Sequence, residues 1–472
     1  MRVVAIDQGT TSTRGFVLEA DGAARVVQTR AHRQSYPRPG WVEHDPEELI
    51  ANIAACLEAA GDADAIGIDN QGESCLAWDA DTGKAVSAVI VWQDNRTQEV
   101  IERLKAEGHE ALTLNRAGLP LDPYFSASKL KWILDNVSAA RTLAKAGRLR
   151  LGTTDAFFLD RLAGIFATDI TTASRTCLMN LETGRWDADL CQLFGVPVEA
   201  LPEIRPTMGE FGAITVAGRK VPVTASLVDQ QASLYGHGCR RAGDAKITFG
   251  TGAFALALTG ETICRAPERG LLPTVAWQRA GEAPVHALDG GVYCASSAVN
   301  WARALGLFRQ FSAIDRFDAP PAIVRGLAFV PALAGLACPH WDRSAAGLWI
   351  GMSLDTTPAD LVQAVLEGVA LRTGEVIAEM SRLVPIGDEI SIDGGMSANP
   401  YFCQVLADVL ARRVKVQAMS ELTAKGTALM AAGRADGGDE KITGLRVYEP
   451  LNASAQWAGL FSRAVERSRG WR

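Results

Sequence analysis

Short apolar segments that end in turns rich in glycine and threonine recur along the chain. The first turn joins two apolar runs within residues 3–18 and includes the sequence DQGTTSTR. The second joins two apolar runs within residues 245–259 and has the sequence GTG. Because each turn lies between two β-rich runs, the pattern predicts two β-hairpins, one near the start of each half of the chain.

In the first half, a helix and a further strand follow the hairpin. Asp45 and Pro46 precede two glutamates, which is typical of a helix N-terminus, and apolar residues at helical spacing continue from residue 49. Residues 65–69 form a short apolar run that ends in the polar turn 70–74. The alternation of strand, helix and strand predicts an α/β domain.

The second half repeats this order. A strand is predicted around residues 222–228, running through the polar residues 229–231 into a helix that begins at residue 232. Near the C-terminus, an apolar run at residues 389–393 leads through a glycine-rich turn into a helix over residues 402–411. A length of 472 residues exceeds the usual size of one hydrophobic core. We therefore expect two lobes, 1–238 and 239–472.

Composition and charge narrow the class of protein. Hydrophobic residues make up 48% and charged residues 21%, as in ordinary globular proteins. The net charge of -7 argues against bulk binding to nucleic acid or to an anionic membrane, so neither partner is expected. Nine cysteines occur without a C-x-x-C pair or zinc spacing, which favours buried thiols in a reducing compartment. A strand begins almost at the N-terminus and no apolar run could cross a bilayer, so the expected location is cytoplasmic.

Four aspartates end predicted strands. They are Asp7, Asp69, Asp229 and Asp393. At the carboxyl end of a strand, a side chain leaves the sheet and faces the region where ligands bind in α/β proteins. Turns dense in backbone N–H groups and small hydroxyls suit phosphate oxygens, and the acids beside them could hold magnesium or water. The two hairpins therefore indicate a duplicated, two-lobed phosphotransfer protein with nucleotide between the lobes.

Other nucleotide and hydrolase motifs are weaker or absent. Residues 250–255 satisfy the loose pattern G-x-G-x-x-A, but a dinucleotide site requires a helix next, and the residues that follow predict a strand. The sequence contains neither G-x-x-x-x-G-K-[ST] nor G-x-S-x-G, and its six histidines lack metal-ligand spacing. Dehydrogenase, Walker-type kinase and hydrolase functions are disfavoured.

Eight segments carry a resemblance to a known family. They are 7–14 (DQGTTSTR), 39–46 (PGWVEHDP), 91–97 (VWQDNRT), 121–127 (LDPYFSA), 173–176 (ASRT), 229–232 (DQQA), 250–252 (GTG) and 393–395 (DGG). In this order they resemble the FGGY carbohydrate kinases, and among these most closely the glycerol kinases. The resemblance spans nearly the whole chain. It implies an α/β, two-lobed actin-like ATPase (ribonuclease H-like) fold with the active site in the interlobe cleft.

The resemblance also implies residue roles, with ATP and Mg²⁺ as cofactors. Asp229 matches the general base, which would accept the proton of the acceptor hydroxyl as that oxygen attacks the γ-phosphorus. Asp7 matches the residue near the metal. The acceptor contacts match acids, amides and aromatics: Glu73, Trp92, Tyr124, Asp229, Gln230 and Phe254. The nucleotide contacts match Thr10, Thr11, Ser12, Arg14, Thr251, Ser296, Asn300, Gly395 and Asn399. The first lobe would bind mainly the acceptor and the second mainly the nucleotide.

This chain departs from the glycerol kinase pattern at three positions. Glycerol kinases carry N-Q-R-E where this chain has Asn-Gln-Gly-Glu, so Gly72 replaces an arginine that donates to acceptor hydroxyls. Either another residue such as Arg96 supplies that contact, or the acceptor is a larger polyol or sugar. Ser296 and Asn300 stand where glycine and glutamine are common, which could alter purine contacts.

The expected activity is ATP-dependent phosphorylation of a polyol or sugar, with glycerol as the first candidate. A four- or five-carbon polyol or ketose is the alternative acceptor, and a non-enzymatic actin-like nucleotide switch is the alternative from another class. The candidate assemblies are a homodimer and a homotetramer. Some bacterial glycerol kinases bind fructose 1,6-bisphosphate through a G-K-G-G-T-R loop, and the corresponding residues 215–222 (TVAGRKVP) lack that pattern.

Overall fold

The computed structural model describes residues 1–417, 419, 421–433, 445–452 and 455–472, which divide into two compact units. The main division falls between Gly238 and Cys239. Two later segments, Thr274–His286 and the one that begins at Glu421, belong to the first unit. The sequence pattern alone places both in the second lobe, because local patterns do not report which sheet a distant segment packs against.

A six-stranded sheet forms the centre of the first unit. Its strand order is β13-β14-β5-β1-β2-β3, with β1 antiparallel to β2 and parallel to β5, and β5 parallel to β14. The first predicted hairpin is therefore confirmed as β1 and β2. The strands are β1 (Val3–Gln8), β2 (Ser12–Leu18), β3 (Ala24–Ala31), β5 (Ala65–Asn70), β13 (Ala213–Val216) and β14 (Arg219–Val228).

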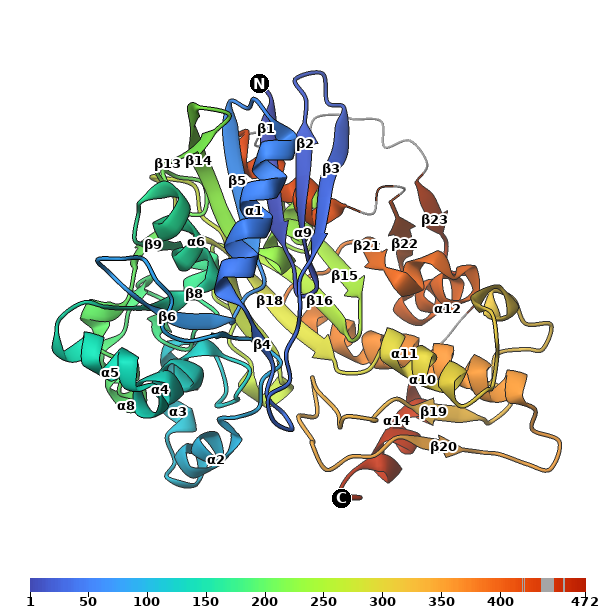
Figure 1. Ribbon diagram of the computed structural model, residues 1–472. Helices are drawn as coiled ribbons and strands as arrows, with labels where there is room; N and C mark the ends of the chain where they lie inside the picture. The colour runs from blue at the N-terminus through green and yellow to red at the C-terminus, as the bar shows by residue number, and fades with distance from the viewer. Residues whose placement is uncertain (418, 420, 434–444, 453–454) are drawn as a thin grey trace. The chain divides into compact units, whose positions relative to one another are not determined.

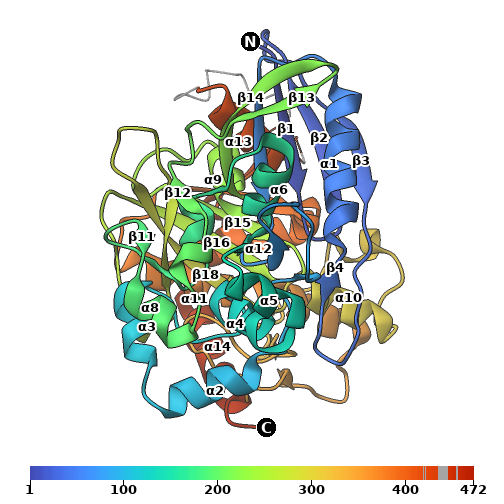
Figure 2. The same ribbon diagram turned by 60° about the vertical axis from the view of Figure 1, so that its left-hand side comes forward.

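Helices pack on both faces of this sheet. Successive side chains of a strand point to opposite faces, so Ile6 and Ile68 lie on one face with the core residues of α1 (Pro46–Ala60) and α6 (Thr154–Ala163) (Figures 1 and 2). Helix α13 (Leu422–Ala431) covers the other face. A β carbon on Gly67 would lie 2.9 Å from the Thr427 carbonyl oxygen, so glycine permits this close approach.

Smaller elements complete the first unit. A second sheet has the order β4-β7-β6-β8, and short paired strands and helices surround it. These elements are β4 (Glu43–His44), β6 (Cys75–Asp79), β7 (Val89–Ile90), α2 (Gln98–Ala106), α3 (Glu110–Arg116), α4 (Ser126–Asn136), α5 (Ser138–Lys145), β8 (Leu149–Thr153), β9 (Ala167–Asp169), α7 (Ile170–Ala173), β10 (Met179–Asn180), β11 (Arg185–Trp186), α8 (Ala188–Phe194), η1 (Val198–Ala200), β12 (Glu203–Arg205) and α9 (Asp229–Gly236).

The second unit repeats the sheet of the first. In it, neighbouring strands follow the order β18-β16-β15-β21-β22-β23, with β15 antiparallel to β16 and parallel to β21, and β21 parallel to β22. The second predicted hairpin is confirmed as β15 and β16. The strands are β15 (Ala245–Phe249), β16 (Ala253–Gly260), β18 (Val285–Val292), β21 (Glu389–Gly394), β22 (Arg413–Val416) and β23 (Arg446–Tyr448). Strand β17 (Leu272–Trp277) begins in the second unit and ends in the segment Thr274–His286 of the first.

Helices and a separate pair of antiparallel strands, β19 and β20, accompany the second sheet (Figure 1). The long helix α11 begins at a capping box in which Thr357 and Asp360 bond each other's backbone N–H groups, and it contributes much of the core. The elements are η2 (Pro267–Arg269), α10 (Ser296–Ala304), η3 (Phe311–Ile314), β19 (Ala328–Val330), β20 (Leu348–Ile350), α11 (Pro358–Ser381), η4 (Gly395–Ala398), α12 (Pro400–Leu410) and α14 (Ala455–Ser468). Within the described part of the chain, we find no helix of the length and apolarity that crossing a membrane requires.

Candidate functional site

The first hairpin places two acids side by side. Asp7 on β1 is in register with Asp69 on the parallel strand β5, and with Arg14 on the antiparallel strand β2. Arg14 Nη1 donates to Asp7 Oδ2 at 3.1 Å. Burial raises the pKa of the Asp7 carboxyl, although the Arg14 guanidinium acts in the opposite direction. Arg14 thus neutralises only part of the negative charge of the two acids.

Asp69 is the more deeply buried of the two acids. Burial, together with the nearby carboxylates of Asp7 and Asp229, raises the pKa of Asp69 well above its usual range. Thr427 Oγ1 donates to its Oδ2 at 2.6 Å, whereas its Oδ1 is buried without a hydrogen-bond donor. An unmet carboxylate oxygen among neighbouring acids is what a hard cation or its water ligands would satisfy.

The residues around Asp7 therefore fit a magnesium ion held by few protein ligands. Mg²⁺ keeps several waters and usually takes only one or two carboxylates besides substrate phosphates. The part of the chain that the structure describes contains no group of three or more His, Cys, Asp or Glu arranged to hold a metal. Asp7 and Asp69 are two neighbouring carboxylates at this place.

A strained turn follows β5. Glu73 has φ 63°, in the left-handed region that non-glycine residues seldom adopt, and Ser74 N donates to the Gly72 carbonyl at 2.8 Å. The side chain of Glu73 is buried and accepts a 2.6 Å hydrogen bond from Arg175 Nε. Strain of this kind persists where the surroundings fix it, and it is concentrated at functional sites.

Arg175 is a functional candidate that the sequence analysis left without a role. Its side chain is 5% exposed and lies with its guanidinium carbon 5.8 Å from the ring centroid of Tyr124. Arg96 is engaged elsewhere, because it donates to Asp94 and Glu43 and stacks over Trp41 at 3.8 Å. Arg175 is thus the arginine that pairs with Glu73. The sequence showed Arg175 within the segment ASRT, but it gave no sign that Arg175 pairs with Glu73.

The predicted acceptor residues of the first unit come from several elements. Trp92 Nε1 donates to Thr10 Oγ1 at 3.1 Å, which ties this indole to the first hairpin turn. The rings of Trp92 and Tyr124 meet edge to face at 5.6 Å. Asp229 and Gln230 are the first two residues of α9, directly after β14, and both are half-buried. The helix begins three residues earlier than the sequence pattern predicted.

The other predicted residues of the first hairpin lie on its turn. The turn is closed by a 3.0 Å bond from Gly9 N to the Ser12 carbonyl, and His32 contacts the carbonyl oxygens of Thr10 and Thr11. Thr11 is exposed. These contacts use backbone carbonyls, so the Thr11 hydroxyl remains on the surface of the turn.

In the second unit, the hairpin turn packs on the N-terminus of α10. The Thr251 carbonyl accepts from Ala295 N at 2.9 Å and from Ser297 N at 3.2 Å, and Ser296 N donates to the Gly250 carbonyl. Ser296 Oγ lies 3.3 Å from the Phe249 carbonyl. Thr251 itself is exposed. The turn and the start of α10 are therefore joined by backbone hydrogen bonds.

A pocket of about 430 Å³ opens in the second unit beside this surface. Its size is that of small-molecule sites, and most of its lining side chains are apolar. Four predicted nucleotide residues are brought together here. The lining residues are Ser296, Val299, Asn300, Phe311, Ile314, Asp315, Leu366, Gly395, Met396, Ala398 and Asn399.

Asn399 has a structural role at this pocket, whereas packing assigns none to Gly395. Asn399 caps α12 by accepting from Phe402 N at 2.7 Å, and its amide donates to the Ile314 carbonyl at 2.9 Å. A β carbon on Gly395 would meet Ser296 Oγ at 3.8 Å and no closer atom, so glycine is not required there by packing. Phe254 lies apart from the pocket lining, on β16, with its ring over Gly291.

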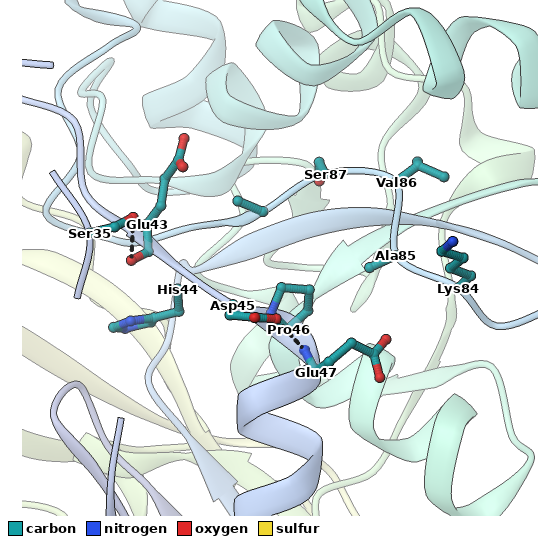
Figure 3. A pocket seen from close by; sticks show the side chains of 11 residues that line it. Ser35, Glu43, His44, Asp45, Pro46, Glu47, Lys84, Ala85, Val86 and Ser87 are labelled. Atoms are coloured by element: carbon teal, nitrogen blue, oxygen red, sulfur yellow. Dashed lines mark hydrogen bonds between the residues drawn. The ribbon is translucent and has the colours of Figure 1, made fainter. Parts of the chain in front are cut away.

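A pocket of about 510 Å³ in the first unit lies at the N-terminus of α1 (Figure 3). Figure 3 shows Glu43 and Lys84 on opposite sides of it, and Asp45 bonded to the backbone of Glu47. Its acids are engaged in the fold, since Glu43 pairs with Arg96 at 2.7 Å and Glu47 with Arg161. The pocket contains none of the predicted site residues.

Comparisons with known proteins identify the family. The N-terminal domain of the FGGY family of carbohydrate kinases matches residues 2–236, and its C-terminal domain matches residues 245–435. A glycerol kinase of Thermus brockianus is 41% identical, with 99% of each chain covered, and one of Alkalilimnicola ehrlichii is 40% identical over 99% of this chain and 98% of its own.

Solved structures agree with the sequence comparisons. The crystal structure of Plasmodium falciparum glycerol kinase with ADP matches with a TM-score of 0.90 and 27% identity, covering 99% of this chain and 98% of that one. The xylulose kinase of Rhodospirillum rubrum matches with a TM-score of 0.83 and 25% identity, covering 99% and 97%. The predicted two-domain, actin-like α/β fold is thereby confirmed. The chain belongs to the FGGY family of carbohydrate kinases and is an ATP-dependent kinase.

Proposed function

We propose that this protein transfers the γ-phosphoryl group of ATP to a hydroxyl of glycerol or of a closely related short polyol or sugar. The observation that carries the proposal is the buried Glu73–Arg175 pair on its strained turn, in the same unit as the first residues of α9. A fixed acid and a fixed cation can accept from and donate to neighbouring hydroxyls of one acceptor. The glycerol kinases that match this chain over nearly its whole length support the same acceptor class.

In this proposal Asp229 is the general base. It would accept the proton of the attacking hydroxyl while that oxygen approaches the γ-phosphorus. Gln230 beside it would bond a second hydroxyl, and Trp92 and Tyr124 would cover the C–H side of the acceptor. Phe254 stays a predicted acceptor contact.

Asp7 and Asp69 would hold magnesium, which when bound would neutralise charge on the transferred phosphoryl group. The turns that contain Thr10, Thr11, Ser12 and Thr251 would offer N–H groups and hydroxyls to phosphate oxygens. The apolar pocket of the second unit would take the adenine ring, with Asn300 and Ser296 at its polar edge.

A second acceptor class is favoured by Gly72. The arginine expected there by resemblance is missing, and Arg96 is fully engaged with Asp94, Glu43 and Trp41. Glycerol would therefore lose a charged hydrogen bond, which contributes roughly 1.5–3 kcal/mol. A four- or five-carbon polyol or ketose could regain that free energy through an additional hydroxyl contact.

The test is a coupled ADP-release assay with purified protein and Mg-ATP. Glycerol, tetritols, pentitols and ketopentoses are compared with a reaction that lacks acceptor, and phosphorylated products are identified by mass spectrometry. We expect acceptor-dependent ADP release with at least one three- to five-carbon compound. ADP release that no polyol or sugar increases would contradict the proposed function. Light scattering of the same sample would test the predicted homodimer or homotetramer.

A further inference from the structure

The side chain of Val228 lies over Gly72. A β carbon placed on residue 72 would lie 3.0 Å from Val228 Cγ1 and 3.5 Å from Cγ2. The first distance is shorter than ordinary van der Waals contact between carbons, so any side chain at position 72 would press on this valine. The two residues directly precede Glu73 and Asp229, the acid and the base of the proposed acceptor site.

The backbone around Val228 fixes the position of its isopropyl group. Val228 ends β14 in register with Asn70 of β5, and its N–H donates to Thr171 Oγ1 at 3.0 Å. It is also the residue at which the chain turns from the strand into α9, and it is 3% exposed. A β-branched side chain has few rotamers, so Val228 cannot simply rotate away from residue 72.

We propose that Val228 is a specificity-determining residue for the acceptor and that it forms an interlocked pair with Gly72. This inference rests on the proposed function. Where the glycerol kinase pattern has an arginine side chain, this chain has the glycine backbone of residue 72 and the two methyl groups of Val228. Val228 thus crowds a side chain at 72, and it also occupies part of the space that the missing side chain would otherwise leave to a longer acceptor.

The pair has two consequences for the acceptor. First, the acceptor meets an apolar surface here, so recognition of its hydroxyls depends on Glu73, Arg175 and Gln230. Second, the methyl groups of Val228 limit acceptor length on this side. Shortening Val228 should therefore favour four- and five-carbon acceptors over glycerol, whereas adding a side chain at 72 should be tolerated only when Val228 is shortened.

The first experiment compares Val228→Ala with Val223→Ala. Val223 lies on the same strand, is fully buried, and is five residues away, about 16 Å along an extended chain. The measured quantity is the ratio of kcat/KM for a pentitol or tetritol to kcat/KM for glycerol. We expect Val228→Ala to raise this ratio about tenfold, which is typical of one to two methyl groups in a specificity pocket. Val223→Ala should lower stability but leave the ratio at the wild-type value.

The second experiment is a double-mutant cycle with Gly72→Arg and Val228→Ala, with kcat/KM for glycerol as readout. Gly72→Arg alone should lower this value below that of the wild type. In the Val228→Ala background, the same substitution should raise it, because the arginine then has room beside Glu73. If Gly72→Arg does not fold on its own, a melting transition regained in the Gly72→Arg, Val228→Ala double variant shows the same coupling, and a double variant that also fails to fold counts against the pair.

The outcomes separate this inference from the proposed function. A wild-type protein that phosphorylates no polyol or sugar contradicts the proposed function itself. If the wild type is active, equal acceptor ratios for Val228→Ala and Val223→Ala overturn the role of Val228. An effect of Gly72→Arg that is the same in both backgrounds overturns the interlocked pair.

Discussion

The two sheets share one frame but carry different chemistry at its end. In each sheet, the first strand of a hairpin pairs with a parallel strand. The next-to-last residue of that first strand is in register with an aspartate of the parallel strand. In the first sheet that residue is Asp7, opposite Asp69. In the second it is Thr248, opposite Asp393, and the buried Lys246 donates to its hydroxyl at 2.9 Å. The first frame thus places two acids in register, beside Arg14, whereas the second places one acid opposite a hydroxyl that is bonded to a lysine.

The next strand extends this difference. In the first sheet, β14 leads directly into Asp229, whose charge contributes to the raised pKa of Asp69. In the second sheet, the strand in the corresponding place, β22, is followed by Gln417. The negative charges of Asp7 and Asp229 both act on Asp69, so acidic side chains are concentrated at the end of the first sheet.

The turns after the parallel strands also differ. After β5, Glu73 is forced into a left-handed conformation and pairs with Arg175. After β21, the short helix η4 places Gly395 and Met396 on the wall of an apolar pocket. A duplicated frame therefore sets where ligands approach, whereas the few residues at its strand ends decide between charged and apolar ligands.

The comparison is tested most severely at Asp229. Asp229→Asn keeps the size of the side chain but cannot accept a proton, so kcat should fall on the order of 10²–10⁴-fold. Steady-state ADP release with the best acceptor measures the loss, and nucleotide binding by calorimetry should persist. Asp187→Asn, at the N-cap of α8, is the matched control and should retain activity. Near-normal turnover of a folded Asp229→Asn variant would remove this residue from the mechanism.

The second prediction concerns the buried pair after β5. Arg175→Ala removes the cation that pairs with Glu73 and leaves the Glu73 carboxylate buried without it. The free energy of unfolding should therefore fall by about 3–5 kcal/mol. Urea denaturation at neutral pH measures it. Arg14→Ala is the comparison, because Arg14 is 39% exposed and its bond to Asp7 should contribute at most about 1 kcal/mol. Equal losses of unfolding free energy in the two variants would mean that the buried Glu73–Arg175 pair contributes no more to stability than the exposed pair.

Much of this frame could be predicted from local sequence. The hairpins, the strands that contain Asp69 and Asp393, and the helix capped by Asp45 follow from patterns within about ten residues. The start of α9 was predicted too late, because Asp229 and Gln230 read as strand-end polar residues although they already form the first helical turn.

Contacts between distant segments could not be predicted in this way. The partner of Glu73 lies 102 residues away, and the partner of Asp69 on α13 lies 358 residues away. Nothing near Gly72 in sequence indicates that Val228 fills the space beside it. These pairings arise from the packing of whole elements, so only the fold discloses them.

The third prediction uses the acid pair of the first sheet. Because the pKa of Asp69 is raised in the folded protein, its ionisation opposes folding. Stability from this group is fully present below the pKa of the unfolded chain. It falls as pH rises toward the folded pKa, by about 1.4 kcal/mol for each pH unit that separates the two pKa values. Asp69→Asn should remove this fall, so metal-free protein should gain stability at pH 8 but not at pH 4, while losing activity.

Urea denaturation in a chelator at the two pH values measures the third prediction. Asp393→Asn is the control from the second sheet, since Asp393 stands opposite a threonine and is only half-buried. A gain at pH 8 of similar size in both variants would mean that the two strand ends do not differ electrostatically.

The smallest effect is expected at the outer edge of the first sheet, where β13 turns into β14. Val216 pairs with Arg219, so only Ala217 and Gly218 form the turn, and both have positive φ, 48° and 80°. Such a two-residue hairpin turn has no loop in which N–H groups could surround a phosphate. The Arg219 side chain is instead exposed, and its Nη1 lies 3.5 Å from Asp62 Oδ1. We therefore expect fructose 1,6-bisphosphate to leave kcat and KM unchanged, and Arg219→Ala with Lys220→Ala to behave as the wild type. Saturable inhibition that this double variant abolishes would mean that the short turn binds a bisphosphate after all, and that the sheet edge as well as the strand ends carries ligand chemistry.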